Sequence, residues 1–314
     1  MDNEKFKIRV SNKTYYSLIN DMHTFDFYKP NGELNKNKFY HAVIRGFYSN
    51  YKSTQQDIAD VLLKELPNFD TNKITSIALK INDYISSNRH SDKSLKYHPC
   101  NIYITVTNDT REMYNDIEIN ALRNETMSEF IRNLFHEYLS TPQHERERCI
   151  FWNSFLQIRE ALSNSQEIII KTSNGVSNRF RPFGIFTSDN QTFSYLVGHM
   201  VTKKRTFINS IRISRIKMII NTNVSYDFTE DEVKAFEESL SHGPELIGEK
   251  MNRVIVKFDN IGVKKYDSLH IGRPYFTECN EETNEYTFDC DEGKLFNYLI
   301  QFGKHVKIIS PKRL

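Results

Sequence analysis

The chain begins with apolar and basic side chains in alternation. One face of this period-two pattern holds Phe6, Ile8 and Val10, and the other holds Lys5, Lys7 and Arg9. Such alternation is typical of a strand with one buried face and one solvent face. Two helical patterns follow, separated by a break at residues 29–32, and the second is expected to begin at Asn35 or Asn37. Residues 1–52 therefore predict a strand–helix–helix unit.

The same order of elements recurs about ninety residues later. Residues 102–106 alternate again, and two helical patterns follow them. Asn108 or Asp109 is the expected cap of the first helix, and the second helix is expected to begin near Thr126. These patterns predict a second strand–helix–helix unit over residues 98–142.

The two units form a diverged internal repeat. Ile8 and Ile104 are 96 residues apart, whereas Phe39 and Phe130 are 91 apart. The first copy therefore has the longer loop between its helices. Helical patterns over residues 53–97 predict a connector between the copies.

A unit with this order of elements resembles the ribbon-helix-helix family of DNA-binding proteins. The segment Met127-Ser128-Glu129-Phe130-Ile131-Arg132 is similar to the start of that family's second helix. The family pairs two units, so that their strands form an antiparallel ribbon that enters the major groove. The resemblance implies tandem, pseudo-dimeric units, which could pair within one chain or between two chains.

The resemblance also implies which residues face nucleic acid. They are the outer positions of the two strands, Lys5, Lys7 and Arg9 on the first and Asn101, Tyr103 and Thr105 on the second. The N-termini of the second helices, near residues 35–36 and 126–128, would hold phosphates through their N–H groups. A competing interpretation is that these strands only form a solvated face of a dimerisation module.

The second half of the chain combines one helix with several short strands. Residues 145–163 have helical spacing, within a linker helix expected over 143–164. Strand-like runs follow at 168–171, 180–186, 193–197 and 206–220, and they predict a small β-barrel or a strongly curved sheet. A capping-box pattern at Thr229-Glu230-Asp231-Glu232 predicts a helix over 229–241.

Three segments of this half resemble the WYL-domain family. They are Arg181-Pro182-Phe183-Gly184-Ile185, Ser194-Tyr195-Leu196-Val197-Gly198-His199 and Ile211-Arg212-Ile213-Ser214-Arg215-Ile216. Ser194 stands where the family has Trp, and Ser214 stands where it has Asp. Residues 253–259 and 302–314 are similar to the family's C-terminal extension. The resemblance covers 145–314 and implies an Sm/SH3-like barrel over 165–228, followed by a connector helix and a small α/β extension over 229–314.

The WYL module is proposed to sense anionic ligands, often nucleotides or nucleic acid. Carried over by motif, the candidate binding residues here are Arg181, Tyr195, His199, Arg205, Arg212 and Arg215. Arginine binds phosphate through paired hydrogen bonds, and a tyrosine ring stacks on a base. Tyr195 is equally well interpreted as a core aromatic residue, and a lone histidine such as His199 is more often structural. Arg212 and Arg215 would face opposite sides of one strand unless a bulge or turn lay between them.

The net charge of +2 conceals three segments of different sign. Residues 1–52 hold nine Lys and Arg against five Asp and Glu, a net of +4, and residues 98–142 hold three against seven, a net of −4. Residues 165–220 hold nine against two, a net of +7. Basic segments of this kind attract polyanions. The charge of 165–220 suits a polyanion better than a single nucleotide.

Several classes of protein are disfavoured. The four cysteines, at 100, 149, 279 and 290, form no C-x-x-C pair, so we expect reduced thiols and a cytoplasmic location. No apolar run is long enough for a membrane span, and the charged N-terminus predicts no signal peptide. His136-Glu137 and His144-Glu145 lack the second histidine of a zinc-protease helix. The glycines of 243–250 resemble a phosphate loop, but Glu249 stands where its lysine should be. We expect no catalysis, no metal and no cofactor.

The sequence therefore predicts an α+β, non-enzymatic, nucleic-acid-binding regulator. The combination of ribbon-helix-helix-like units with a WYL module resembles the WYL accessory proteins of type VI-D CRISPR systems, which bind single-stranded RNA and modulate an RNA-guided RNA nuclease. A ligand-responsive transcriptional regulator that binds duplex DNA through the ribbon is the main alternative, and a dimerisation scaffold is a third. The expected partners are single-stranded RNA or duplex DNA, a nucleotide-like ligand, a CRISPR effector nuclease and a second copy of the chain.

Overall fold

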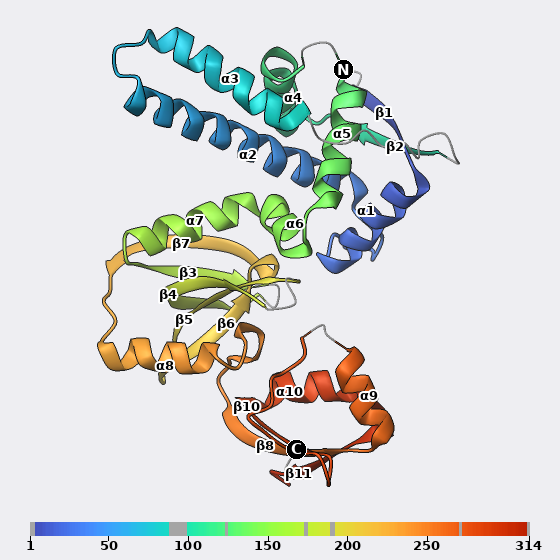
Figure 1. Ribbon diagram of the computed structural model, residues 1–314, viewed down its shortest axis with the longest axis vertical. Coiled ribbons are helices and arrows are strands. Elements are labelled where there is room, and N and C mark those ends of the chain that lie inside the picture. Colours follow the sequence, from blue (N-terminus) through green and yellow to red (C-terminus); the bar gives the residue numbers. More distant parts are fainter. Residues whose placement is uncertain are drawn as a thin grey trace. The chain divides into compact units, whose positions relative to one another are not determined.

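The computed structural model describes residues 4–87, 99–122, 125–172, 175–188, 192–269 and 272–312. The chain divides into two compact units, Met1–Trp152 and Asn153–Leu314 (Figure 1). Both mix helices with antiparallel sheets, as the sequence predicts. No helix in the described ranges is long and apolar enough to cross a membrane. The same ranges contain no group of three or more His, Cys, Asp or Glu arranged to hold a metal ion.

The first unit contains the strand–helix–helix order twice. In chain order its elements are β1 (Lys5–Val10), α1 (Asn12–Thr24), α2 (Lys36–Glu65), α3 (Thr71–Ser87), β2 (Cys100–Thr105), α4 (Asn108–Asn120), α5 (Met127–Ser140) and α6 (Gln143–Ile150). Asn35 caps α2, and Thr126 caps α5 with a capping box formed by Glu129. The cap of α4 is Thr107, not Asn108 or Asp109, because the Thr107 and Thr110 side chains form the reciprocal capping box.

β1 and β2 form an antiparallel ribbon within this one chain. Its inner face is buried and carries Ile8, Val10, Ile102 and Ile104. Near the centre of the register Lys7 pairs with Tyr103. With the repeat offset of 96, Tyr103 occupies the position in the second copy that Lys7 occupies in the first. The two copies are therefore related by a local two-fold axis through this pair, as in an isologous dimer.

Each copy uses its second helix to cover the strand of the other copy. From α2, Asn37 Nδ2 donates to Thr105 O at 3.1 Å, and His41 Nε2 lies 3.0 Å from the same oxygen. From α5, Ser128 Oγ donates to Lys7 O at 3.2 Å, and Arg132 Nε donates to Arg9 O at 2.8 Å. Ser128 and Arg132 are the counterparts of Asn37 and His41 at the offset of 91. The outer edges of both strands are covered in the same way, so neither copy is complete alone.

The helices of the structure differ from the expected ones at two places. α2 continues to Glu65, so the expected division at 52/53 lies within one helix, and α3 packs back against α2 as a hairpin (Figure 1). The single helix expected over 145–163 is broken at Phe151, which caps α6 before α7 (Trp152–Ser163) begins. The division between the two compact units lies at this break.

The second unit contains a five-stranded antiparallel sheet in the order β6-β5-β4-β3-β7. The strands are β3 (Gln166–Thr172), β4 (Ser177–Thr187), β5 (Ser194–Val201), β6 (Thr206–Arg212) and β7 (Ile216–Ser225). Only the 3-10 turn η2 (Ile213–Arg215) joins β6 to β7, yet these strands lie at opposite edges. The sheet must therefore curl strongly. In the described residues no hydrogen-bonded ladder joins β6 to β7, so the sheet is open: it is the strongly curved sheet of the prediction, and the Sm/SH3-like barrel is not closed.

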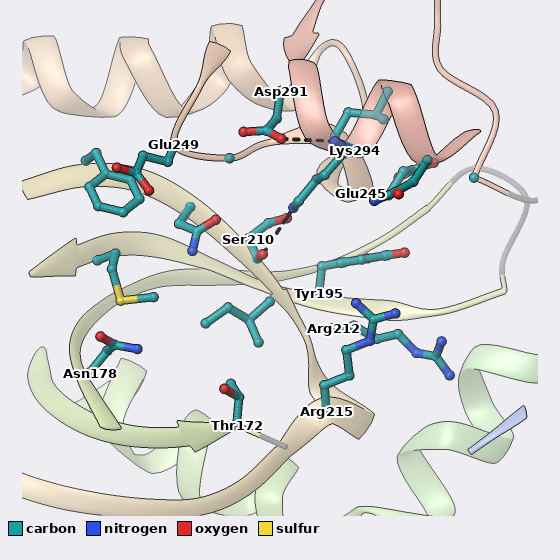
Figure 2. Close-up of a pocket in the computed structure, with 18 of the residues that line it drawn as sticks. Thr172, Asn178, Tyr195, Ser210, Arg212, Arg215, Glu245, Glu249, Asp291 and Lys294 are labelled. Atoms are coloured by element: carbon teal, nitrogen blue, oxygen red, sulfur yellow. Dashed lines mark hydrogen bonds between the residues drawn. The ribbon is translucent and has the colours of Figure 1, made fainter. Parts of the chain in front are cut away.

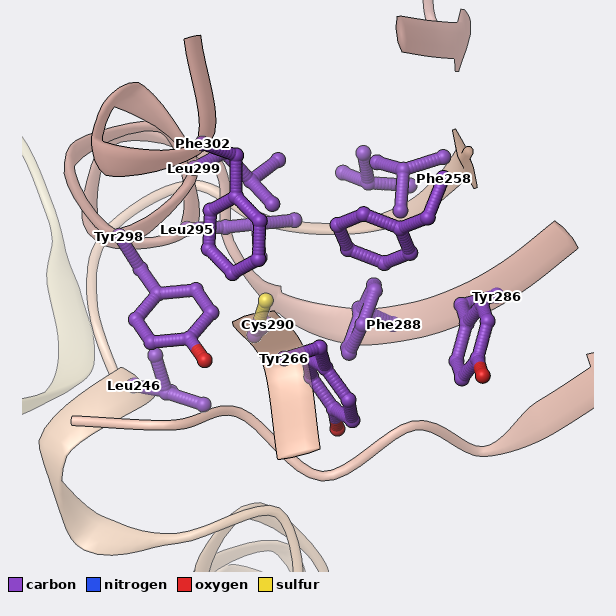
Figure 3. Close-up of a cluster of buried hydrophobic side chains, with 12 residues drawn as sticks. Leu246, Phe258, Tyr266, Tyr286, Phe288, Cys290, Leu295, Tyr298, Leu299 and Phe302 are labelled. Carbon is purple, nitrogen blue, oxygen red and sulfur yellow. The ribbon is translucent and has the colours of Figure 1, made fainter. Parts of the chain in front are cut away.

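A smaller α/β module completes the second unit. The helix α8 (Glu230–Leu240) has the predicted Thr229–Glu232 capping box, and the 3-10 turn η3 (Pro244–Leu246) follows it. The module has an antiparallel sheet in the order β11-β8-β10-β9, with β8 (Met251–Phe258), β9 (Glu278–Asn280), β10 (Glu285–Asp291) and β11 (Val306–Ser310). The helices α9 (Asn260–Ser268) and α10 (Glu292–Leu299) and the 3-10 segment η4 (Ile300–His305) pack on it. Their shared core includes Phe258, Tyr266, Phe288, Leu295 and Phe302 (Figure 3).

Candidate nucleic-acid interface

A cavity of about 1170 Å³ lies in the second unit, between the five-stranded sheet and the α/β module. Its walls come from β5, β6, η2, the connecting segment 244–250 and α10 (Figure 2). Six lining residues are basic: Lys203, Lys204, Arg205, Arg212, Arg215 and Lys294. Three are acidic: Glu245, Glu249 and Asp291. The lining is therefore net basic, and it also includes the aromatic residues Phe193, Tyr195, Phe207 and Tyr298.

The turn η2 brings Arg212 and Arg215 to the same cavity. β6 ends at Arg212, and the helical turn that follows replaces the strand geometry that would have sent Arg215 to the opposite face. Tyr195 lies directly across from Arg212 in the β5–β6 register, and Figure 2 shows these three side chains together. The Arg212 guanidinium carbon lies 3.3 Å from the centroid of the Phe193 ring. This end of the cavity thus combines two guanidinium groups with two aromatic rings.

Tyr195 has a structural contact as well as a cavity contact. It is half-buried and packs against the apolar cluster of Val197, Phe236 and Ile247. It also lines the cavity. Both interpretations that the sequence left open for Tyr195 therefore describe part of its environment.

The other end of β6 has a second arginine–aromatic pair. The Arg205 guanidinium carbon lies 5.2 Å from the centroid of the Phe207 ring, and Arg205 forms an ion pair with Glu249. Phe207 and Arg212 are five residues apart on the edge strand β6, which corresponds to roughly 16 Å at about 3.3 Å per residue, so their side chains leave opposite faces of the strand and both line the cavity. Lys203 and Lys204 line the cavity beside Arg205. The cavity therefore has two separated cationic, aromatic positions along β6.

Lys294 fastens α10 to β6. Its Nζ donates to Ser210 Oγ at 3.0 Å, to Ser210 O at 3.3 Å and to Ile247 O at 2.6 Å. All three acceptors are uncharged, and burial lowers the pKa of Lys294 from 10.5 to about 8. Asp291 caps the same helix by accepting from the Gly293 and Lys294 amides.

Arg181 and His199 do not line this cavity. They are direct partners across β4 and β5, and Arg181 Nε lies 3.3 Å from the buried Glu167 carboxylate. The His199 ring packs against Phe228 and Phe236, with centroids 5.5 and 4.8 Å away. Burial lowers the pKa of His199, although Glu232 lies 3.5 Å from its Nδ1. Both residues therefore have structural contacts, and Tyr195, Arg205, Arg212 and Arg215 are the WYL candidates that meet at the cavity.

The outer face of the ribbon carries the remaining candidates. Lys5, Lys7, Arg9 and Tyr103 are exposed, and 60% of the Tyr103 surface is accessible. In the described part of the chain no carboxylate pairs with Lys5, Lys7 or Arg9. This face therefore presents three cations beside one exposed ring.

Several cavity residues were not singled out from the sequence. Lys203, Lys204 and Phe207 did carry a signal, because a basic run precedes an alternating strand. Glu249 was noted only as a departure from a phosphate loop and Lys294 was not noted, because both reach the cavity only through the packing of the α/β module against β6. Phe193 was predicted as a strand residue, not as a platform for Arg212.

Comparisons with known proteins support the fold. No protein-family model matches the chain, and no curated protein sequence matches it. Among solved structures, the crystal structure of a CRISPR Cas-related protein aligns with a TM-score of 0.69 and 18% identity, over 100% of this chain and 90% of that one. Proteasome accessory factor B/C (PafBC) of Arthrobacter aurescens aligns with a TM-score of 0.27 and 12% identity, over 99% of this chain and 48% of that one. The chain shares the fold of the CRISPR Cas-related protein, whereas the second score is too low to support an argument.

Proposed function

We propose that this protein is a non-enzymatic regulator that binds single-stranded RNA in the cavity along β6. The observation that carries the proposal is the pair of arginine–aromatic positions at the two ends of one strand, Arg205 with Phe207 and Arg212 with Phe193. Arginine binds phosphates, and aromatic rings and guanidinium planes stack on unpaired bases. A single strand offers both chemistries at each nucleotide, whereas a duplex hides its base faces.

The separation of the two positions favours a polymer over a single nucleotide. At roughly 16 Å, one nucleotide does not reach from Phe207 to Arg212. Lys203 and Lys204 extend the basic surface beyond Arg205. A strand of several nucleotides that follows the edge of β6 would reach the groups on both of its faces.

The shared fold with a CRISPR Cas-related protein supports a role beside a CRISPR system. In this proposal the five-stranded sheet is a WYL-type module with an Sm/SH3-like curl, and the β1–β2 ribbon with its cross-packed helices is a ribbon-helix-helix pseudo-dimer. The protein acts in the cytoplasm as an accessory that modulates an RNA-guided RNA nuclease, and it has no catalytic step of its own.

The test is binding of labelled single-stranded RNA and a matched DNA duplex across a salt series. Arg212→Ala/Arg215→Ala should reduce RNA affinity at least tenfold, because two charge-assisted contacts are lost. The matched control, Arg159→Ala/Lys234→Ala, removes two charges from exposed positions outside the cavity and should change affinity little. RNA binding that survives the first pair of substitutions would refute a cavity site.

The second candidate is a DNA-binding transcriptional regulator that uses the ribbon. The exposed cations of β1 and the complete β1–β2 pairing favour it. Preferential binding of the duplex, unaffected by Arg212→Ala/Arg215→Ala, would support this function. If neither nucleic acid binds at low salt, only the scaffold function remains.

A further inference from the structure

Two polar attachments of very different strength hold the α/β module near β6, one at Ser210 within the strand and one at Arg205 directly before it. One is the Lys294 attachment, where three donor contacts to uncharged oxygens of Ser210 and Ile247 are largely shielded from water. The other is the Arg205–Glu249 ion pair, whose side chains are 54% and 49% exposed. An exposed ion pair contributes only about 0–1 kcal/mol. Of the two attachments, the second is therefore the one that a ligand can break.

Glu249 lies on a segment that is fixed to the α/β module. The amide of Lys250 donates to Asp291 Oδ2 at 2.8 Å, and the amide of Glu292 donates to Lys250 O at 3.1 Å. Gly248 lies so close to Asp291 that an added Cβ would be 2.5 Å from its Oδ2. The backbone position of Glu249 is thus set by the start of α10, and its side chain contacts Arg205.

The Arg205 guanidinium cannot bind the Glu249 carboxylate and a phosphate equally well at the same time. A phosphate bound along β6 would be close to the Glu249 carboxylate, and two anions at one guanidinium repel each other. Arginine–phosphate contacts are charge-assisted and commonly bidentate, so they outcompete an exposed carboxylate contact.

We propose that Glu249 is a built-in competitor of the nucleic-acid phosphate for Arg205. Polynucleotide binding transfers Arg205 from Glu249 to the phosphate and frees the Glu249 side chain, while Ile247 keeps its hydrogen bonds to Ser210 and Lys294. The Lys294 attachment stays in place, and the hydrogen bonds of Lys250 to Asp291 and Glu292 link the released Glu249 to the start of α10. This inference rests on the proposed function of the cavity and adds a specificity-determining residue and a means of regulation to it.

A double-mutant cycle tests the exchange, with a labelled oligouridylate as the probe and the full chain. Glu249→Gln should tighten binding about two- to fivefold, since the competing ion pair of up to about 1 kcal/mol is removed. In an Arg205→Gln background, which binds more weakly, Glu249→Gln should have no further effect. Glu237→Gln, an exposed carboxylate of α8 outside the cavity, is the matched control and should leave affinity unchanged.

Amide hydrogen exchange gives a second measurement on the unaltered protein. Oligouridylate should accelerate exchange of the amides of Gly248 and Glu249, while the amides around Ser210 keep their protection. If Glu249→Gln tightened binding equally in both backgrounds, competition for Arg205 would be refuted, because the loss of a negative charge would alone explain the tighter binding. Unchanged affinity of Glu249→Gln would also overturn it. Absence of any oligouridylate binding by the unaltered protein would instead refute the proposed function.

Discussion

Lys7 and Tyr103 face each other at the centre of the β1–β2 ribbon, on the solvent side of the two strands. They are equivalent positions of the repeat, so the chain supplies both halves of the ribbon itself. The halves differ in charge, because residues 1–52 carry a net of +4 and residues 98–142 a net of −4. The ribbon is therefore complete within one chain, and the cations of its outer face are all on the β1 side.

This asymmetry predicts the effect of neutralising β1. Lys5→Gln/Lys7→Gln/Arg9→Gln should weaken ribbon-mediated binding to a DNA duplex and reduce the slope of log K against log salt by about 2.7, at about 0.9 per phosphate contact. Asn101→Ala/Thr105→Ala, on the uncharged strand, is the control and should leave the slope unchanged. The measurement is fluorescence anisotropy across a salt series. A slope that the triple substitution does not alter would support a ribbon that serves only for assembly.

A second prediction concerns the close packing of α2 against α6. A Cβ added at Gly46 would lie 1.6 Å from the carbonyl oxygen of Cys149, so the two helices must separate to accept any side chain. Gly46→Ala should lower the free energy of unfolding of the first unit by about 1–3 kcal/mol or more, despite the better helix propensity of alanine. Asn50→Ala, at an exposed position of the same helix, is the control. Urea denaturation followed by circular dichroism measures both, and equal stability of the two variants would contradict the packing.

The sequence predicted elements best where local chemistry determines them. The alternation of β1 and the Thr229–Glu232 capping box are set by neighbouring residues, and the structure confirms both. The division at 52/53 separated the first repeat unit from the helical pattern that follows it, and no helix-breaking residue interrupts α2 there. The strand pattern left a small barrel and a strongly curved sheet open, because pairing of β6 with β7 depends on tertiary curvature that no local pattern records.

The same distinction applies to the candidate site. The sequence motif identified Arg212 and Arg215, and strand geometry required a bulge or turn to bring them together. The 3-10 turn η2 is that turn. It also grouped Arg181 and His199 with them, because a motif does not record which face of a sheet a side chain occupies. Glu249 and Lys294 reach the cavity from another module, so only the folded chain shows their relation to Arg205 and Ser210.

A third prediction follows from the buried Lys294. Its pKa is lowered to about 8 when folded, against 10.5 in the unfolded chain. Between pH 8 and 10.5 the unfolded chain keeps the Lys294 proton that the folded chain has released. The contribution of Lys294 to the free energy of unfolding therefore rises with pH across this window and is least favourable below pH 8. The Tm of the natural protein minus that of Lys294→Met should therefore increase from pH 7 to pH 10. Taking this difference removes the effects of the tyrosines, which titrate in both proteins. A difference that stays constant or decreases would show that the ammonium is not desolvated.

The final prediction separates the roles of Phe193 and Tyr195 at the cavity. Phe193 supports the Arg212 guanidinium from 3.3 Å, so Phe193→Ala should release that side chain and weaken oligouridylate binding about threefold to thirtyfold, in the range of a cation–π contact of about 0.5–2 kcal/mol. Phe193→Leu keeps the bulk without the ring and should weaken binding nearly as much.

Tyr195→Phe retains a ring that can stack on a base and should bind almost normally, whereas Tyr195→Ala should lose a stacking contact worth about 1–3 kcal/mol. Because Tyr195 also packs against Val197 and Phe236, the Tm of each variant must accompany its affinity. If Tyr195→Ala lowers the Tm but binds oligouridylate normally, Tyr195 is a core residue only, and the bases stack elsewhere along β6.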